Sequence, residues 1–280
     1  MQEMTGPTAS SSEPAPRHGQ EDIDASRAPL MEHLVELRQR LVYALVSILI
    51  GFVICFYFAN NLYTLLVQPY RWATEWAVGK SDVTMIFTHP AEFFFTQLKL
   101  ALFGATCLAF PNIAIQVWKF VAPGLYKDEK DAFLPYLIAT PLLFILGALM
   151  VYFIVTPAMM YFFIKMQVTS AELKIELLPR VADYLSLIMT LILGFGVCFQ
   201  LPIALSLLAR AGFINGDQLR SFRRYAIVAI AAVAAVLSPP DPFSMLAMMA
   251  PTMLLYEVSI FVVDRIAKAR EAKAAAASGP

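Results

Sequence analysis

Six long blocks of the sequence contain no Asp, Glu, Lys, Arg or His. An α-helix rises about 1.5 Å per residue, so about 20 residues cross a hydrocarbon core about 30 Å thick. The first, third and fourth blocks are long enough to cross it, and the second becomes so once 93–99 is added. The pattern predicts a polytopic membrane protein and disfavours a large soluble helical bundle. The blocks are Leu41–Tyr70, Leu100–Trp118, Ala132–Ile164, Tyr184–Ala209, Tyr225–Pro240 and Pro242–Tyr256.

We expect an all-α integral membrane protein with six transmembrane helices, of which the last two are short and joined by a Pro-rich turn. Tyr225–Ser238 would reach only about 21 Å as a helix. The turn at 238–242 breaks the chain because proline lacks a backbone donor and restricts its predecessor. A re-entrant hairpin that never emerges fits these two segments almost as well. The expected spans are 41–60, 94–117, 133–156, 184–208, 225–239 and 243–262.

Segments of different composition flank the predicted membrane domain, 30–263. Residues 1–29 are polar, rich in Ser, Pro and acidic residues, and contain no apolar run. We expect a disordered cytoplasmic tail there and no cleaved signal peptide. Residues 264–280 form a low-complexity Ala/Lys segment, which we interpret as a second cytoplasmic tail that is helical near the membrane.

Lys and Arg gather in alternate connections of this predicted topology. Cytoplasmic loops of membrane proteins carry an excess of these residues. Most of the 21 lie in the N-terminal segment, the second and fourth loops and the C-terminal tail. Both termini are therefore expected in the cytoplasm. Six spans agree with this, because an even number of crossings places both termini on one side of the membrane. The long connections 61–92 and 157–183 then face outward, and we expect short helices in them.

Composition excludes several other classes of function. The chain is 59% hydrophobic and 15% charged, so it holds no large soluble domain, and its formal net charge of zero gives no indication of nucleic-acid binding. Cys55, Cys107 and Cys198 lie singly in separate apolar blocks, and the three His residues are scattered. Neither a disulfide nor a metal site is indicated. No nucleotide-binding or hydrolase motif is present, so we expect no catalysed reaction, no cofactor and no metal.

The segment before the first span, 30–41, has the periodicity of an amphipathic helix at the cytoplasmic interface. Its leucines fall on one face, and Glu36 and Arg40 fall on the other. Taken alone, this spacing indicates an ordinary i,i+4 ion pair, worth about 0.2–0.5 kcal/mol. Glu129, at the mouth of the third span, is by itself equally compatible with a solvated surface residue.

Longer motifs are more specific. The run HLVELRQRL at 33–41 resembles the HLxELRxRL signature of the twin-arginine translocase C subunit (TatC) family. The segment from Gln116 to Glu129 is similar to that family's cytoplasmic motif between its second and third spans. Further matching segments begin at Thr88, Asp183, Phe195 and Ser238. The matches run in family order from about residue 30 to 263.

The resemblance implies a signal-peptide receptor and scaffold for the export of folded proteins across a bacterial inner membrane, driven by the proton gradient. It implies recognition of a pair of arginines in the signal peptide, and a guanidinium is a planar fork that a carboxylate can bind bidentately. Implied partners are small single-span subunits (TatA/TatB type), further copies of the chain and the lipid bilayer. The positions that match the family's signal-recognition site are Glu36, Glu129, Arg38, Phe120, Leu125 and Tyr126.

Polar residues within the spans are the remaining candidates. Gln200 lies inside an apolar block, where either a partner-helix contact or an ordinary helix–helix hydrogen bond is expected. Ser238 matches a hydroxyl that the family uses for partner docking, and Asp241 suits either partner contact or helix capping. Glu92 and Lys99 share a helix face, which favours either an intramolecular pair or an outward-reaching lysine. The alternative function, a secondary transporter or channel for a small solute, predicts repeated halves and mid-membrane charges, and neither is evident.

Overall fold

The structure, a computed structural model, describes most of the chain. The backbone is described for 18–79, 82–125, 134–169, 174–175, 177–238 and 241–277. Side chains are described for 34–79, 82–120, 135–167, 177–238, 241–269 and 272.

Helices make up most of the described backbone. Within hydrocarbon, each backbone N–H and C=O must bond inside its own segment, and an apolar run satisfies this requirement as a helix. Two short strands, β1 (Val168–Thr169) and β2 (Lys174–Ile175), pair antiparallel. The helices are α1 (His18–Tyr57), α2 (Ala59–Val78), α3 (Glu92–Leu125), α4 (Leu134–Met150), the π-helix η2 (Val151–Val155), α5 (Thr156–Lys165), α6 (Val181–Cys198), α7 (Leu201–Arg210), α8 (Gly216–Ser221), α9 (Arg223–Leu237) and α10 (Pro242–Ala277).

Five helical stretches in the described residues are long and apolar enough to cross a membrane. They correspond to the first four expected spans and the last one. Helix α9 corresponds to the fifth expected span and has 15 residues, about 22 Å of helix. The all-helical membrane fold is confirmed, and the count of six crossing helices stays a prediction. The five stretches are Leu34–Tyr57, Glu92–Phe120, Pro135–Lys165, Val181–Arg210 and Pro242–Ala269.

The last helix corrects the expectation that both final helices are short. Helix α10 has 36 residues, and its membrane-crossing stretch has 28. The helix continues through the Ala/Lys segment because alanine has the highest helix propensity and no breaker interrupts the run. At the other end of the chain, α1 begins at His18, within the segment predicted as a tail. The division into two tails and a membrane domain stays a prediction.

Proline interrupts two of the spans. The third span passes through η2, where Thr156 N–H bonds the carbonyl of Val151, directly before Pro157. The fourth span breaks at Phe199 and Gln200, just before Pro202, and resumes as α7. Since proline cannot donate its backbone nitrogen, helical hydrogen bonding has to adjust on its N-terminal side. The break places Gln200 at a helix junction.

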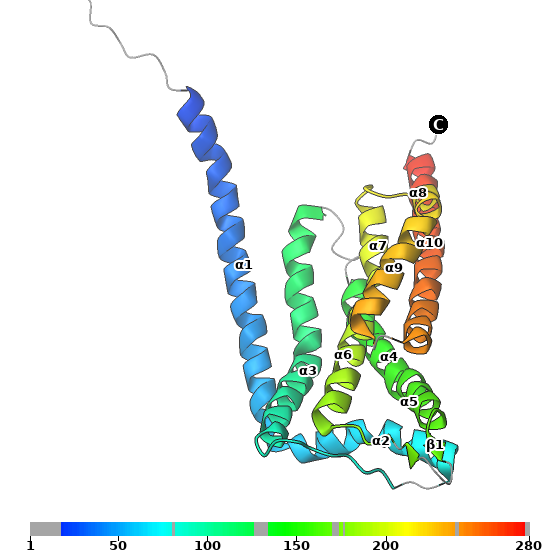
Figure 1. Ribbon diagram of the computed structural model, residues 1–280. Coiled ribbons are helices and arrows are strands. Elements are labelled where there is room, and N and C mark those ends of the chain that lie inside the picture. Colours follow the sequence, from blue (N-terminus) through cyan, green and yellow to red (C-terminus); the bar gives the residue numbers. More distant parts are fainter. Residues whose placement is uncertain are drawn as a thin grey trace, which may run out of the picture.

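The long helices stand beside one another, and α2 lies across one end of the bundle (Figure 1). Helix α1 begins, and α10 ends, at the opposite end. Helices α1 and α3 run antiparallel in close contact: a Cβ added at Gly51 on α1 would lie 3.2 Å from both the Cα and the carbonyl oxygen of Ala105 on α3. A glycine at position 51 therefore lets the two backbones approach closely. Helix α2 confirms the expectation of a short helix in the connection 61–92.

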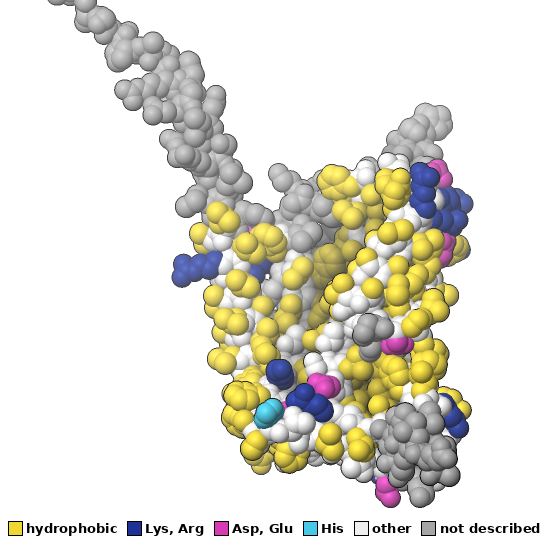
Figure 2. Space-filling view, viewed as in Figure 1, with side chains coloured by type: hydrophobic (Ala, Val, Ile, Leu, Met, Phe, Trp, Pro, Cys, Tyr) yellow, Lys and Arg dark blue, Asp and Glu magenta, His cyan; other side chains and the backbone are white. Residues whose placement is uncertain are grey.

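Helix α6 supplies much of the core, with Leu185, Ile188 and Phe195 fully buried. The Tyr184 hydroxyl donates to the Leu66 carbonyl at 2.8 Å, which attaches α2 to the base of α6. Around this core, hydrophobic side chains cover most of the helix surface visible in Figure 2. Without a membrane such a surface would be exposed to water, so its extent agrees with lipid contact.

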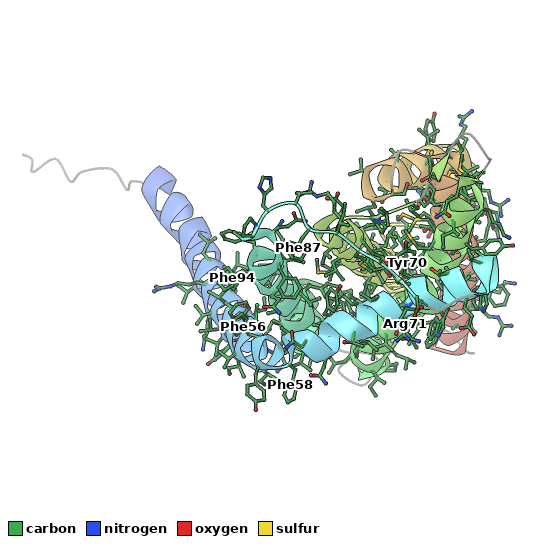
Figure 3. All side chains as sticks on the ribbon, turned by 60° about the horizontal axis from the view of Figure 1, so that its bottom comes forward. Phe56, Phe58, Tyr70, Arg71, Phe87 and Phe94 are labelled. Atoms are coloured by element: carbon green, nitrogen blue, oxygen red, sulfur yellow. The ribbon has the colours of Figure 1, made fainter. Side chains whose placement is uncertain are left out.

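Aromatic side chains gather at the corner where α1, α2 and α3 meet. Phe56, Phe58, Phe87 and Phe94 lie near one another at this corner in Figure 3, and between 43% and 61% of each is exposed. Aromatic residues are enriched where a bilayer meets water. We interpret this corner as lying at the membrane boundary opposite the chain ends.

Candidate functional site

The predicted recognition motif begins on α1, where Glu36 forms an i,i+4 ion pair with Arg40. The Glu36 side chain is 36% exposed and that of Arg40 is 18% exposed. Arg38 is exposed on the same segment. The ordinary pairing expected from the spacing is therefore present, and it keeps a cation beside the carboxylate proposed for recognition.

Phe120, near the end of α3, belongs to the second segment of the predicted recognition site, and its side chain is half-buried. The Asn112 amide lies 3.5 Å from the Tyr43 carbonyl, which fixes the register of the antiparallel helices α3 and α1. Seven residues back along α1 lead to Glu36, and eight residues forward along α3 lead to Phe120. At about 1.5 Å per residue, both lie about 11 Å beyond the contact in the same direction. The two motif residues therefore lie at one level of the bundle.

Three further residues were predicted for the recognition site. Tyr126 and Glu129 lie outside the described residues, and Leu125 is described only in its backbone. The convergence of Glu36 and Glu129 into one pocket therefore stays a prediction.

Gln200, at the break between α6 and α7, makes hydrogen bonds within the chain. Its Nε2 donates to the Thr140 carbonyl on α4 at 3.0 Å and to the Gly196 carbonyl at 3.3 Å. The helix–helix hydrogen bond considered for this residue is therefore present. Its Oε1 is buried and has no hydrogen-bond partner among the described residues. A buried acceptor without a donor carries a desolvation cost of about 1–3 kcal/mol, which a donor would relieve.

Thr140, whose carbonyl binds Gln200, also makes two hydrogen bonds through its hydroxyl. The sequence analysis did not single out this residue. Its hydroxyl accepts a 2.8 Å hydrogen bond from the Trp118 indole and donates to the Tyr136 carbonyl, also at 2.8 Å. The side chain is buried, with 2% exposed. A threonine in an apolar block gives no sequence signal for this role, because a hydroxyl can equally bond its own helix.

The Pro-rich turn between α9 and α10 places Ser238 and Asp241 at two helix ends. The backbone N–H of Ser238 bonds the Ala234 carbonyl and ends α9. Asp241 Oδ1 accepts a 2.7 Å hydrogen bond from the Ser244 N–H, which caps α10. The capping interpretation of Asp241 is therefore correct. Its Oδ2 and the Ser244 hydroxyl are buried without a hydrogen-bond partner among the described residues.

At the far end of the bundle, Glu92 pairs with Arg180 and not with Lys99. Arg180 Nη2 donates to Glu92 Oε2 at 2.9 Å, and the Thr88 N–H and hydroxyl donate to the same oxygen at 3.0 and 3.1 Å. The hydrogen bond from Arg180 to the carboxylate raises the pKa of the guanidinium. Ile86 bridges residues 179–181 beside this pair, through Ile86 N–H to the Pro179 carbonyl. The pair therefore fastens the start of α3 to the start of α6.

A second group of ion pairs fastens α8 and α9 to α10. Arg223 donates to Glu257 at 2.6 Å, and Arg220 pairs with Asp264. The Tyr256 hydroxyl donates to the Leu219 carbonyl at 2.8 Å. Glu257 is thus paired with Arg223, near the ion pair of Arg220 and Asp264.

Among the described residues, no group of three or more His, Cys, Asp or Glu residues could hold a metal ion. The three cysteines are free thiols. The described helices and polar contacts define a multi-pass, all-helical membrane protein whose polar residues brace helices and cap helix ends.

The sequence of this membrane protein matches the family described as Sec-independent protein translocase protein (TatC) over residues 32–251. This match covers more than half of the chain, and the chain belongs to the TatC family.

Individual relatives agree. The chain is 40% identical over 250 residues to a Sec-independent protein translocase protein TatC of Magnetococcus marinus, with 89% of each sequence covered. It is 39% identical over 236 residues to that of Aquifex aeolicus, covering 84% of this chain and 94% of the relative. A crystal structure of the twin-arginine translocase receptor TatC matches with a TM-score of 0.73 and 37% identity, covering 84% of this chain and 99% of that one. These similarities support protein translocation over the alternative of a small-solute transporter or channel.

Proposed function

We propose that this chain is the receptor that binds twin-arginine signal peptides, and the scaffold around which the export machinery for folded proteins assembles. The observation that carries the proposal is that Glu36 on α1 and Phe120 on α3 lie at one level of the bundle. Membership of the TatC family supports it. We further propose that the proton gradient supplies the energy and that the chain itself catalyses no reaction.

The recognition chemistry uses two carboxylates, Glu36 and Glu129, each of which accepts one guanidinium of the signal peptide. Arg38 helps to position them, and Phe120, Leu125 and Tyr126 contact the neighbouring part of the signal. A hydrogen bond to a charged group contributes about 1.5–3 kcal/mol, so two contribute about 3–6 kcal/mol. A millimolar complex already corresponds to about −4 kcal/mol. The arginine pair therefore supplies selectivity, and the apolar part of the signal has to supply the remaining affinity.

Site-specific crosslinking from position 128, beside an intact Glu129, tests this proposal. A photoreactive residue at 128 should capture a signal peptide with Arg-Arg several-fold more efficiently than one with Lys-Lys, because lysine cannot bind a carboxylate bidentately. In cells, Glu36→Ala and Glu129→Ala should each slow export of twin-arginine cargo. Glu75→Ala, an exposed carboxylate on α2 at the other end of the bundle, is the matched control. Export at the normal rate by Glu129→Ala would refute the assignment.

For the small single-span partners, we propose contacts with Gln200, Ser238 and Asp241. Two buried acceptors without a described partner, Gln200 Oε1 and Asp241 Oδ2, support this proposal. A rotation of either side chain that exposes its oxygen would let a polar residue on a partner's transmembrane helix donate to it. Gln200→Leu removes the acceptor and should reduce both partner crosslinking and export. Normal export and normal crosslinking by this variant would remove Gln200 from the site.

We also propose a bacterial inner membrane location with both termini in the cytoplasm. The apolar helices and the bacterial relatives support a multi-pass protein in that membrane. In a variant lacking the three native cysteines, a cysteine at 38 should react with a membrane-impermeant thiol reagent only after the cells are opened. A cysteine at 82 should react in intact spheroplasts. The opposite pattern would reverse the orientation.

A further inference from the structure

The hydrogen bond between Trp118 and Thr140 closes the base of the α3–α4 hairpin. Trp118 lies two residues before Phe120 on α3, and Thr140 lies in the second turn of α4. The 21 residues between them include Leu125, Tyr126 and Glu129. Four of the six residues proposed for signal recognition therefore lie between Trp118 and Thr140 in the sequence, on a connection whose two ends this 2.8 Å hydrogen bond joins.

The same residue also ties this base to the fourth span. The Thr140 carbonyl accepts from Gln200 Nε2 at 3.0 Å, at the break before α7. One turn earlier on α4, the Tyr136 ring lies 5.1 Å from the Arg210 guanidinium at the end of α7, a cation–π contact. Two contacts about one turn apart thus hold α4 against α7.

The donor and acceptor groups of Trp118 and Thr140 make their contact specific. The indole N–H of Trp118 is a donor only, so it needs an acceptor, and the Thr140 hydroxyl both accepts from it and donates to Tyr136. Lipid tails offer no replacement for either partner. A shift of α4 by one residue against α3 would break this hydrogen bond and leave the indole N–H without its acceptor. The two helices are therefore held in one register where the hairpin begins.

We propose that Thr140 is a positioning residue for signal-peptide binding. Through Trp118 it fixes the relative height of the two helices that carry the hairpin, and through Gln200 it fixes that hairpin to the fourth span. Phe120 is thereby held at the level of Glu36. The inference rests on the proposed receptor function and adds to it residues that do not themselves touch the signal.

The test measures binding of a fluorescent Arg-Arg signal peptide, and of its Lys-Lys version, to the full chain in lipid nanodiscs. Trp118→Phe keeps a smaller aromatic ring and removes the N–H, and Thr140→Val keeps the shape and removes the hydroxyl. Each should weaken Arg-Arg peptide binding by about threefold, which corresponds to the roughly 0.6 kcal/mol average of an interhelical hydrogen bond in membranes. The double variant should lose no more affinity for the peptide than either single variant does, because the two single variants and the double variant all remove the same hydrogen bond between Trp118 and Thr140.

Two further variants separate positioning from general destabilisation. Thr140→Ser retains the hydroxyl and should bind the peptide as the unmodified chain does. Thr106→Val makes the same chemical change on α3, where the hydroxyl bonds only the Leu102 carbonyl of its own helix, and should also leave binding unchanged. If Thr140→Val does not fold, Trp118→Phe gives the answer.

Each outcome is decisive. A lower unfolding temperature with unchanged peptide affinity in Trp118→Phe or Thr140→Val would show a structural role only and overturn the inference. Additive losses in the double variant would also overturn it. Equal binding of the Arg-Arg and Lys-Lys peptides by the unmodified chain would instead refute the proposed function, and the inference with it.

Discussion

Arg180 donates a 2.9 Å hydrogen bond to Glu92, although 88 residues separate them in the sequence. The Glu92 side chain is 8% exposed and that of Arg180 is 41% exposed. The carboxylate also receives both Thr88 donors, so it is the centre of the contact and Arg180 is one of its partners. Two connections of the chain are fastened together at this point.

We therefore expect Glu92→Gln to lower the thermal unfolding temperature more than Arg180→Gln does. The first change weakens three hydrogen bonds at a poorly exposed oxygen, whereas the second removes only one, from a partly solvated side chain. Unfolding of the purified protein in detergent measures both. Asp217→Asn, which affects an ion pair whose acid is 96% exposed, should change nothing. A larger decrease of the unfolding temperature in Arg180→Gln than in Glu92→Gln would show that the guanidinium is the essential group.

A second prediction concerns the competition between Arg40 and an incoming guanidinium for Glu36. An i,i+4 ion pair is worth about 0.2–0.5 kcal/mol, so Arg40→Gln should strengthen Arg-Arg peptide binding by up to about twofold. Glu36→Gln should weaken it at least tenfold, because a charge-assisted hydrogen bond is lost. Peptide titration in nanodiscs measures both changes.

The control for this pair is Arg224→Gln, which makes the same change of charge at a residue whose guanidinium lies over the Tyr225 ring, 5.0 Å from its centroid. It should leave the affinity unchanged. If Arg40→Gln weakened binding instead, Arg40 would be holding Glu36 in its binding orientation and would not be competing for it.

Close packing of α4 on α6 gives a third prediction. A Cβ added at Gly147 would lie 2.9 Å from the Phe195 carbonyl oxygen and 3.1 Å from its carbonyl carbon, and a backbone group cannot rotate away. Gly147→Ala should therefore push the helices apart and lower the unfolding temperature by several degrees, despite the better helix propensity of alanine. Leu146→Ala, on an exposed position one residue earlier, is the control. Unchanged stability in Gly147→Ala would show that the two helices separate easily.

The apolar blocks were enough to predict the fold class and the positions of the five long apolar helical stretches. Ionisable side chains are so costly in hydrocarbon that their absence alone marks the membrane segments. The expectation of a short last helix was wrong, because the Ala/Lys segment, which was expected to be helical near the membrane, continues α10 as far as Ala277. Hydropathy locates the membrane boundary and does not locate the end of a helix.

Polar contacts between distant segments were less predictable. The spacing of Glu92 and Lys99 on one helix favoured an ion pair between them. In the structure Glu92 pairs instead with Arg180, which directly precedes α6. Gln200 was recognisable because a side-chain amide in a span needs a partner. Its partner, the Thr140 carbonyl, is a backbone group and carries no sequence signal. Local periodicity identifies which residues need partners, whereas the packing of helices decides which partners they receive.

The contact between Tyr256 and Leu219 supports a fourth prediction. The Tyr256 hydroxyl donates to the Leu219 carbonyl at 2.8 Å, and the side chain is 6% exposed. Tyr256→Phe keeps the ring and leaves the carbonyl without this donor, which should cost about 1 kcal/mol of unfolding free energy. Tyr225→Phe removes a hydroxyl from a residue that is 57% exposed and should cost nothing measurable. Reversible unfolding in mixed detergent micelles compares the two variants. Equal stability of both would mean that water or lipid headgroups replace the lost donor at Leu219, and that the ion pairs of Arg220 and Arg223 hold α8 and α9 on α10 without it.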